Sequence, residues 1–155
     1  MKTRKIFPRA ALAKVLKQAK PRRLVFTNGC FDLLHVGHVR LLKKARSLGD
    51  ALVVAINSDL SLRALKGRGR PLVPQTQRAE VLAALASVDY VTVFDEDTPL
   101  ETIRLLKPKV LMKGGDYELS EIVGKNQVKK VVRFPLVKSV STTGLIRKIV
   151  KTYAR

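Results

Sequence analysis

The strongest constraint on the fold of this chain is a regular alternation between short apolar runs and longer amphipathic segments. The apolar runs are rich in Val, Leu and Ile, as expected of strands that are buried on both faces. In the amphipathic segments the apolar residues recur every three or four positions, which is typical of helices. We expect strands at 24–27, 51–56, 90–94, 110–112 and 131–137, and helices at 8–19, 36–48, 75–86, 98–106 and 142–153.

Strands that alternate with helices form parallel βαβ units, so the pattern predicts an α/β fold with three layers and a five-stranded parallel sheet. The 155 residues suit a single domain. We expect a basic N-terminal helix within residues 1–22 and the core within residues 23–155. Residues 58–74 are basic and turn-rich and are expected to form a loop, whereas Thr98 is expected to cap the helix after it.

Composition narrows the class of protein. Cys30 is the single cysteine, so no intrachain disulfide is possible. No apolar stretch is long enough to span a bilayer, and the basic N-terminus lacks the apolar run of a signal peptide. We therefore expect a cytoplasmic protein without a membrane span. The net charge is +19, and all twelve acids lie between Asp32 and Glu121, so both ends are basic and attract phosphates or nucleic acids.

In a parallel sheet ligands bind beyond the carboxyl ends of the strands. The loop after Thr27 is the most informative of these ends. Its Gly29 lets a ligand approach the backbone, and His35 and His38 share one face of the next helix. Gly37 between them leaves room for a bulky group, and the free N–H groups at a helix start attract anions. The pattern points to phosphate chemistry.

Other interpretations of these residues stay open. His35 and His38 could ligate a metal together with Cys30 or Asp32, although a catalytic zinc ion usually takes three protein ligands in suitable geometry. The histidines could also be purely structural. Asp32 could cap the helix, and Cys30 is assigned no thiol chemistry.

The segment Thr27–His38 closely resembles the signature of the HxGH cytidylyltransferase-like nucleotidyltransferases, which have a Rossmann-like fold. Further segments, in the expected order, resemble the branch that activates a heptose 1-phosphate by adenylylation. These segments are Asn57-Ser58-Asp59, Lys66-Gly67, Arg70-Pro71, Gln77-Arg78, Asp95–Pro99, Lys113–Tyr117 and Ser141-Thr142-Thr143. In many bacteria this domain is fused to a sugar kinase, and this chain resembles the stand-alone form.

The resemblance implies the following roles. Catalysis would fall to His35 and His38, which would contact the phosphates and stabilise charge. The acceptor substrate would be bound by Asp32, Lys66 and Lys113. The nucleotide would be bound by Cys30, Phe31, Gly37, Asn57, Asp116, Ser141, Thr142 and Thr143, with the last three holding the outgoing pyrophosphate. The implied partners are ATP with Mg²⁺ and a phosphorylated sugar, and relatives are often homodimers.

One departure concerns the glycerol-phosphate cytidylyltransferases, where an arginine opens the segment that ends in Ser-Thr-Thr. Leu136 stands there in this chain, and Lys138 is the nearest cation. The basic loop with Arg63, Lys66, Arg68 and Arg70 could supply the missing charge.

Three rival functions remain. The acceptor could be glycerol 3-phosphate, phosphocholine, flavin mononucleotide or pantetheine phosphate. The chain could be a nucleic-acid-binding module, but it has no recognised nucleic-acid motif, and only 5% of its residues are aromatic. The basic ends could also dock on an anionic membrane surface or a partner.

Overall fold

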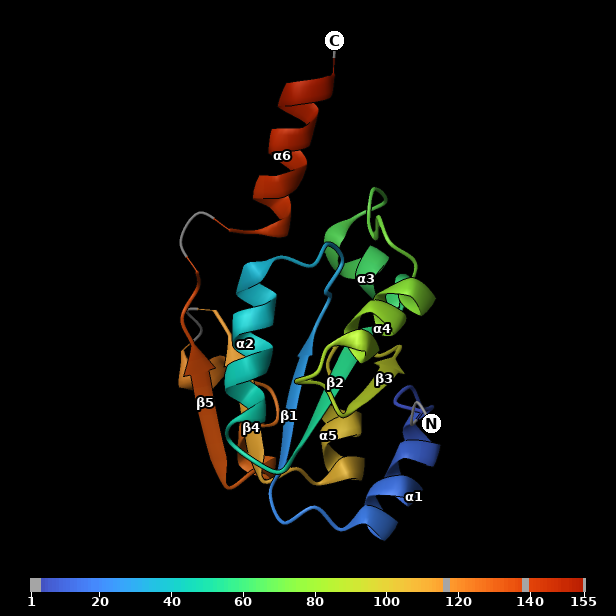
Figure 1. Cartoon of the computed structure of the whole chain (residues 1–155), viewed down its shortest axis with the longest axis vertical. Helices are drawn as coiled ribbons and strands as arrows, with labels where there is room; N and C mark the ends of the chain where they lie inside the picture. The colour runs from blue at the N-terminus through green and yellow to red at the C-terminus, as the bar shows by residue number, and fades with distance from the viewer. Residues whose placement is uncertain (1–3, 116–117, 138–139, 155) are drawn as a thin grey trace.

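The computed structural model describes residues 4–115, 118–137 and 140–154 (Figure 1). Five strands form one sheet in the order β3-β2-β1-β4-β5, and all neighbouring strands are parallel. The strands are β1 (Leu24–Gly29), β2 (Ala51–Asn57), β3 (Tyr90–Phe94), β4 (Val110–Gly114) and β5 (Lys130–Phe134). The predicted five-stranded parallel sheet is confirmed.

Helices cover both faces of the sheet. The helices are α1 (Arg9–Ala19), α2 (Val36–Arg46), α3 (Asp59–Lys66), α4 (Gln75–Ala84), α5 (Leu100–Leu106) and α6 (Thr142–Tyr153), with short 3-10 turns η1 (Leu119–Glu121) and η2 (Lys125–Gln127). Successive strand residues face opposite sides. Val25 packs in one core cluster with Leu42 of α2 and Leu82 of α4, whereas Phe26 packs in another with Leu12 of α1 and Ile103 of α5. The sheet lies between the two clusters, with one layer of helices beyond each, so the fold has three layers.

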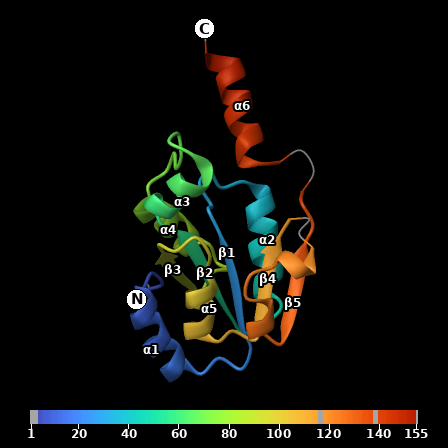
Figure 2. The ribbon, with the colours of Figure 1, turned by 180° about the vertical axis from the view of Figure 1, so that it is seen from behind.

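The strand order places a switch point between β1 and β4. The chain builds outward from β1 to β2 and β3, then returns to lay β4 on the other side of β1. The helix that crosses back, α5, therefore covers the face opposite to α2 and α4 (Figures 1 and 2). The loops after β1 and β4 diverge, and such a point forms a crevice at the carboxyl ends of the strands.

One predicted loop is wrong. Part of the basic segment 58–74 forms α3, whose first turn is capped by Ser58 accepting a hydrogen bond from Ser61 N at 3.2 Å. Leu62 is fully buried and anchors the helix. The high charge of the segment concealed a short helix that depends on one cap and one apolar contact.

Two predicted boundaries also need correction. Thr98 does not cap α5, because Pro99 occupies the N-cap position and no side chain caps the helix there. The last strand ends at Phe134 rather than Val137. Pro135 follows Phe134 and has no N–H to donate to the ladder, which ends the pairing.

Helix α6 stands beyond the carboxyl end of the sheet, apart from the two helical layers (Figures 1 and 2). Ser141 caps it by accepting a hydrogen bond from Gly144 N at 3.0 Å. None of its residues is buried, and Ile149, Val150 and Tyr153 are exposed. Across the described residues, no helix combines the length and the apolar character that crossing a membrane requires.

We predict that Gly49→Ala destabilises the fold. A Cβ atom at Gly49 would lie 2.1 Å from the carbonyl oxygen of Arg23 and 2.6 Å from Val25 Cγ2, so the backbone would have to move. The free energy of unfolding, measured with urea, should fall by roughly 1–3 kcal/mol. Gly69→Ala is the matched control, because no atom lies within 4 Å of its Cβ position. Equal stability of the two variants would contradict this packing.

Candidate functional site

A cleft of 650 Å³ lies at the carboxyl ends of the strands. Its walls come from the loops that follow all five strands, from residues of α2 and α3, and from the start of α6. The predicted site residues that line it are Cys30, Phe31, Asp32, His35, Gly37, His38, Asn57, Lys66, Lys113, Ser141, Thr142 and Thr143. The fold therefore brings these twelve together, whereas Asp116 and Lys138 lie outside the described residues.

The two histidines form a stacked pair at the start of α2. His35 is the N-cap residue and His38 lies in the first turn. Their ring centroids are 3.8 Å apart with 21° between the planes, and the ring of Phe31 lies 5.0 Å from that of His38. The Nδ1 atom of each imidazole is buried without a hydrogen-bond partner among the described residues. We therefore expect the Nε2 atoms to be the ones that contact a ligand.

Both imidazoles are neutral at pH 7. Burial, with a smaller contribution from the nearby His35 imidazole, lowers the pKa of His38 to about 4. Burial also lowers the pKa of His35. Two imidazolium ions at stacking distance would repel each other, so the pair is stable in its uncharged form. A neutral imidazole can donate one hydrogen bond and accept another.

Two glycines make the close approach of these rings possible. A Cβ atom at Gly37 would lie 3.0 Å from the His35 ring and 3.7 Å from Val137 Cβ. A Cβ atom at Gly29 would lie 3.0 Å from the ring of Phe31. A larger residue at either position would push an aromatic ring of the cleft wall.

Asp32 lies beneath the cleft rather than in its open space. Its carboxylate is fully buried and accepts hydrogen bonds from Arg70 Nε at 2.5 Å, Val73 N at 2.9 Å and Leu72 N at 2.9 and 3.0 Å. Burial alone would raise the pKa of Asp32, but these hydrogen bonds lower it below its ordinary value. Asp32 does not cap α2, since His35 holds that position. Its role toward an acceptor substrate stays a prediction.

The metal interpretation finds no support in this geometry. The Asp32 carboxylate is already held by Arg70 and two backbone N–H groups. Among the described residues, no group of three His, Cys, Asp or Glu side chains could hold a metal ion.

Arg78 of α4 lies in one of the family-like segments, but the sequence assigned it no role in the site. Its guanidinium is fully buried and donates to the carbonyl oxygens of Cys30 at 2.6 Å, Asn57 at 2.8 Å and Val73 at 3.0 Å. Val81 of this helix is exposed, whereas Arg78 is buried one turn before Leu82. An arginine on the apolar stripe of a helix was the available signal.

Polar side chains of the other loops complete the walls. Asn57 is buried, and its amide donates to Ser61 Oγ at 3.0 Å. Burial lowers the pKa of Lys113, whose Nζ lies 3.4 Å from Asn28 Oδ1. Lys66 at the end of α3 is exposed at the rim of the cleft.

The start of α6 provides backbone N–H groups at the far wall. Ser141, Thr142 and Thr143 all line the cleft, and Thr142 Oγ1 donates to the carbonyl oxygen of Leu33 at 3.3 Å. This bond ties α6 to the loop that carries the histidines. The helix start favours a negative charge at this wall.

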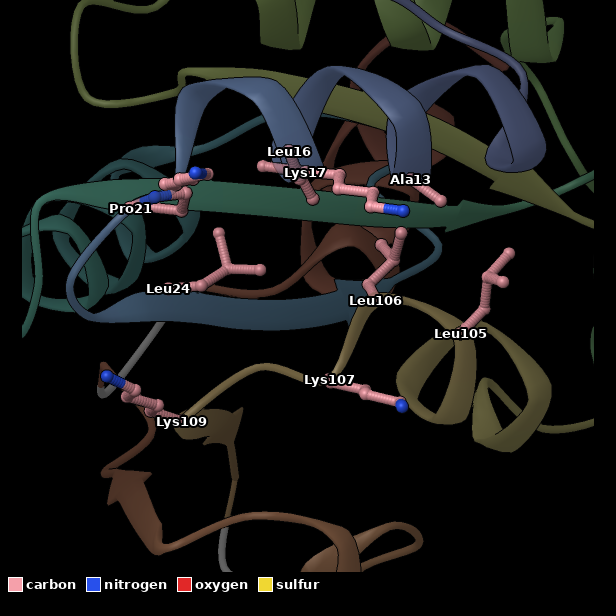
Figure 3. Close-up of a pocket in the computed structure, with 10 residues that line it drawn as sticks. Ala13, Leu16, Lys17, Pro21, Leu24, Leu105, Leu106, Lys107 and Lys109 are labelled. Atoms are coloured by element: carbon pink, nitrogen blue, oxygen red, sulfur yellow. The ribbon is translucent and has the colours of Figure 1, made fainter.

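A second hollow of 470 Å³ lies between α1 and α5, near the amino ends of β1 and β4 (Figure 3). Its apolar floor includes Leu16, Leu24 and Leu106. Its charged groups are four lysines, Lys17, Lys20, Lys107 and Lys109. Lys20 and Lys107 end α1 and α5, where a positive charge balances the helix dipole. No histidine or acid lines this hollow.

A parallel 3-2-1-4-5 sheet, with a glycine at the end of β1 and paired histidines at the start of the next helix, is typical of an α/β nucleotide-binding protein. Residues 26–149 match the family described as Cytidylyltransferase-like. The chain therefore belongs to the cytidylyltransferase-like family of nucleotidyltransferases.

Sequence relatives include Bifunctional protein HldE of Geobacter sulfurreducens, 56% identical over 141 residues. The match covers 88% of this chain and 29% of that protein. The HldE protein of Geotalea uraniireducens is 56% identical over 145 residues, covering 90% of this chain and 30% of that protein. The chain thus spans about three tenths of the length of these relatives.

Solved structures agree on the architecture. The lipopolysaccharide core biosynthesis protein of Thermoplasma volcanium is 28% identical with a TM-score of 0.65, covering 75% of this chain and 98% of that one. The pantoate–β-alanine ligase of Francisella tularensis has a TM-score of 0.61 at 15% identity, covering 95% of this chain and 79% of that one. The second likeness shows the fold alone.

We predict that acid destabilises the protein through the histidine pair. Between pH 6.5 and about 4 the unfolded chain binds a proton at His38 and the folded chain does not, because the folded pKa is about 4. The stability from neutral His38 is therefore complete above pH 6.5 and is lost as the pH falls toward 4. The Tm of the wild type should fall across this window.

His38→Gln should show a weaker dependence of Tm on pH over the same window. Asp32 contributes little to the change in Tm over this window, since its folded pKa lies below the ordinary value of 3.8. A wild-type Tm that stays constant between pH 7 and 4.5 would count against the buried neutral pair.

Proposed function

We propose that this chain transfers AMP from ATP to the phosphate of a sugar 1-phosphate and releases pyrophosphate. The observation that carries the proposal is the stacked pair of neutral imidazoles, which faces the cleft at the switch point of the sheet. Gly29 at the end of β1 and the start of α6 line the same cleft and favour a polyphosphate there.

The reaction needs positioning more than acid–base chemistry. An oxygen of the acceptor phosphate is already anionic, and it would attack the α-phosphorus of ATP in line. The new P–O bond forms as the bond to the β-phosphate oxygen breaks, and pyrophosphate leaves with that electron pair. Catalysis then consists of holding the two phosphates together and stabilising the developing charge.

The two histidines would supply that stabilisation from Nε2. In the tautomer that carries its proton on Nε2, the buried Nδ1 has no N–H group that lacks an acceptor. Nε2 can then donate a hydrogen bond to the phosphates. A hydrogen bond from a neutral N–H strengthens as its phosphate acceptor gains negative charge, so these bonds are stronger in the transition state. His35 and His38 therefore respond to the charge that the reaction develops.

Mg²⁺ is expected to accompany ATP. The described residues contain no group of three metal-ligating side chains. This is compatible with an ion that would be held by the phosphate oxygens of ATP rather than by protein side chains. When bound, the ion supplies neutralisation of phosphate charge. The chain itself contributes backbone N–H groups, imidazoles and the lysines of the cleft.

The sugar acceptor is supported by two observations. The segments Lys113–Tyr117 and Ser141–Thr143 resemble the heptose branch of the family. The relatives named HldE are 56% identical to this chain, and the similar Thermoplasma volcanium protein is described as acting in lipopolysaccharide core biosynthesis. We therefore propose D-glycero-β-D-manno-heptose 1-phosphate as the acceptor and ATP as the donor.

A matrix of donors and acceptors tests the substrates. ATP, CTP and GTP are each combined with the heptose 1-phosphate, glycerol 3-phosphate and flavin mononucleotide, and pyrophosphate release is measured. We expect the ATP–heptose phosphate pair to react fastest. A faster reaction with CTP and glycerol 3-phosphate would replace the proposed substrates, and salt-sensitive RNA binding without pyrophosphate release would replace the proposed activity.

We predict that His35→Ala and His38→Ala each lower kcat by roughly 10²-fold or more, the scale for loss of a preorganised donor. The measurement uses saturating ATP and Mg²⁺. Lys17→Ala, in the hollow at the opposite end of the sheet, is the control and should keep its activity. Near-normal turnover in both histidine variants would remove them from the mechanism.

A further inference from the structure

We infer that Arg78 is a positioning residue that acts on the nucleotide through a peptide bond, by turning the N–H group of Phe31 toward the bound phosphates. The inference rests on the proposed function, since it assigns a task within the same site. Arg78 does not line the cleft and would not touch the nucleotide.

The contacts of Arg78 join segments that are distant in the sequence. Arg78 is 1% exposed, and its Nη1 donates to the Cys30 carbonyl at 2.6 Å. Its Nη2 donates to the Asn57 carbonyl and to Asp59 Oδ1, both at 2.8 Å, and its Nε donates to the Val73 carbonyl at 3.0 Å. One side chain therefore fixes the loop after β1, the loop after β2 and the connection from α3 to α4.

The bond to Cys30 sets the direction of the next N–H group. A trans peptide is planar, with its C=O and N–H groups pointing in opposite directions. The Cys30 carbonyl points at the buried guanidinium, so the N–H of Phe31 points away from Arg78. Cys30 and Phe31 both line the cleft, and no described residue accepts a hydrogen bond from this N–H. It is free to donate to an anion.

Phe31 needs this support because its backbone is strained. Its φ of 47° lies in the left-handed region, which is costly for a bulky residue without outside contacts. Arg78 holds the peptide before Phe31, and Asp32 after it is held by Arg70, Leu72 and Val73. The strained turn is thus fixed on both sides by buried charged groups.

The guanidinium also strengthens the donor that it orients. A hydrogen bond to a carbonyl polarises the whole peptide, which makes its N–H a better donor. Within the described residues Arg78 forms an ion pair with Asp59 alone, whose side chain is one-third exposed. The positive charge beneath the loop is therefore only partly compensated, and it favours an anion above the loop.

The test separates positioning from stability. Arg78→Gln removes the charge and most of the donors, and Arg78→Lys keeps the charge but cannot reach three carbonyls at once. Leu82→Ala is the matched control, because Leu82 is fully buried on the same helix one turn later and lies in the apolar core. The Kd for ATP, without acceptor, is measured by calorimetry together with the Tm of each variant.

We expect Arg78→Gln to weaken ATP binding roughly tenfold to a hundredfold, the scale of one hydrogen bond to a charged group. Arg78→Lys should lie between it and the wild type. Leu82→Ala should lower the Tm while its Kd stays near that of the wild type. Equal Kd values for Arg78→Gln and Leu82→Ala at similar Tm losses would overturn the inference.

A second measurement uses the wild-type protein and so does not depend on the folding of any variant. The ¹⁵N–¹H signal of Phe31 should shift on titration with inorganic pyrophosphate as well as with ATP. No shift with either anion would overturn the inference. If the wild type releases no pyrophosphate from any donor yet the Phe31 signal responds to pyrophosphate, the proposed function fails while the anion-binding role of the Phe31 N–H group stands.

Discussion

The constraint on which the cleft depends is a pair of buried charges of opposite sign, Asp32 and Arg78. Asp32 accepts hydrogen bonds from the N–H groups of Leu72 and Val73, and Arg78 donates hydrogen bonds to the carbonyls of Val73 and Cys30. The loop after β1 and the connection from α3 to α4 therefore cannot move independently. A buried charge is tolerated only when its hydrogen bonds are made, so each group enforces the geometry around it. The cleft floor is fixed before any ligand arrives.

The histidine pair follows from the same rigidity. The imidazoles stack at 3.8 Å beside Phe31 because Gly37 leaves no side chain between them and the cleft wall. Burial keeps both rings neutral, and their Nδ1 atoms have no partner among the described residues. Such unpaired polar atoms are costly in a core. Their presence beside an open cleft, rather than within either apolar cluster, supports the proposed role of the pair in binding a ligand.

The sequence predicts the sheet well because each strand is a short apolar run between turn residues. It predicts the members of the cleft from the β1 loop and from a family resemblance, and the fold brings the described ones together. Helix α3 was missed because it is only eight residues long and lies within a basic, turn-rich segment that was interpreted as a loop. The partners of Arg78 are backbone carbonyls of Cys30, Asn57 and Val73, and a carbonyl leaves no mark in a sequence. The arginine itself was visible, but its targets depend on the tertiary fold.

Electrostatic interactions act in this protein over two distances, a long one set by the net charge and a short one within the cleft. The net charge of +19 comes from basic ends that flank a nearly neutral middle, and it raises the encounter rate with any polyphosphate. At the cleft the two imidazoles are uncharged donors, and an N–H group aimed by a peptide plane carries no formal charge at all. Permanent cations at every contact would hold the substrate and the transition state about equally tightly, which would lower KM without raising kcat. Neutral donors that gain strength as phosphate charge develops stabilise the transition state more than either bound state. The basic ends are therefore suited to capture, and the histidine pair is suited to turnover.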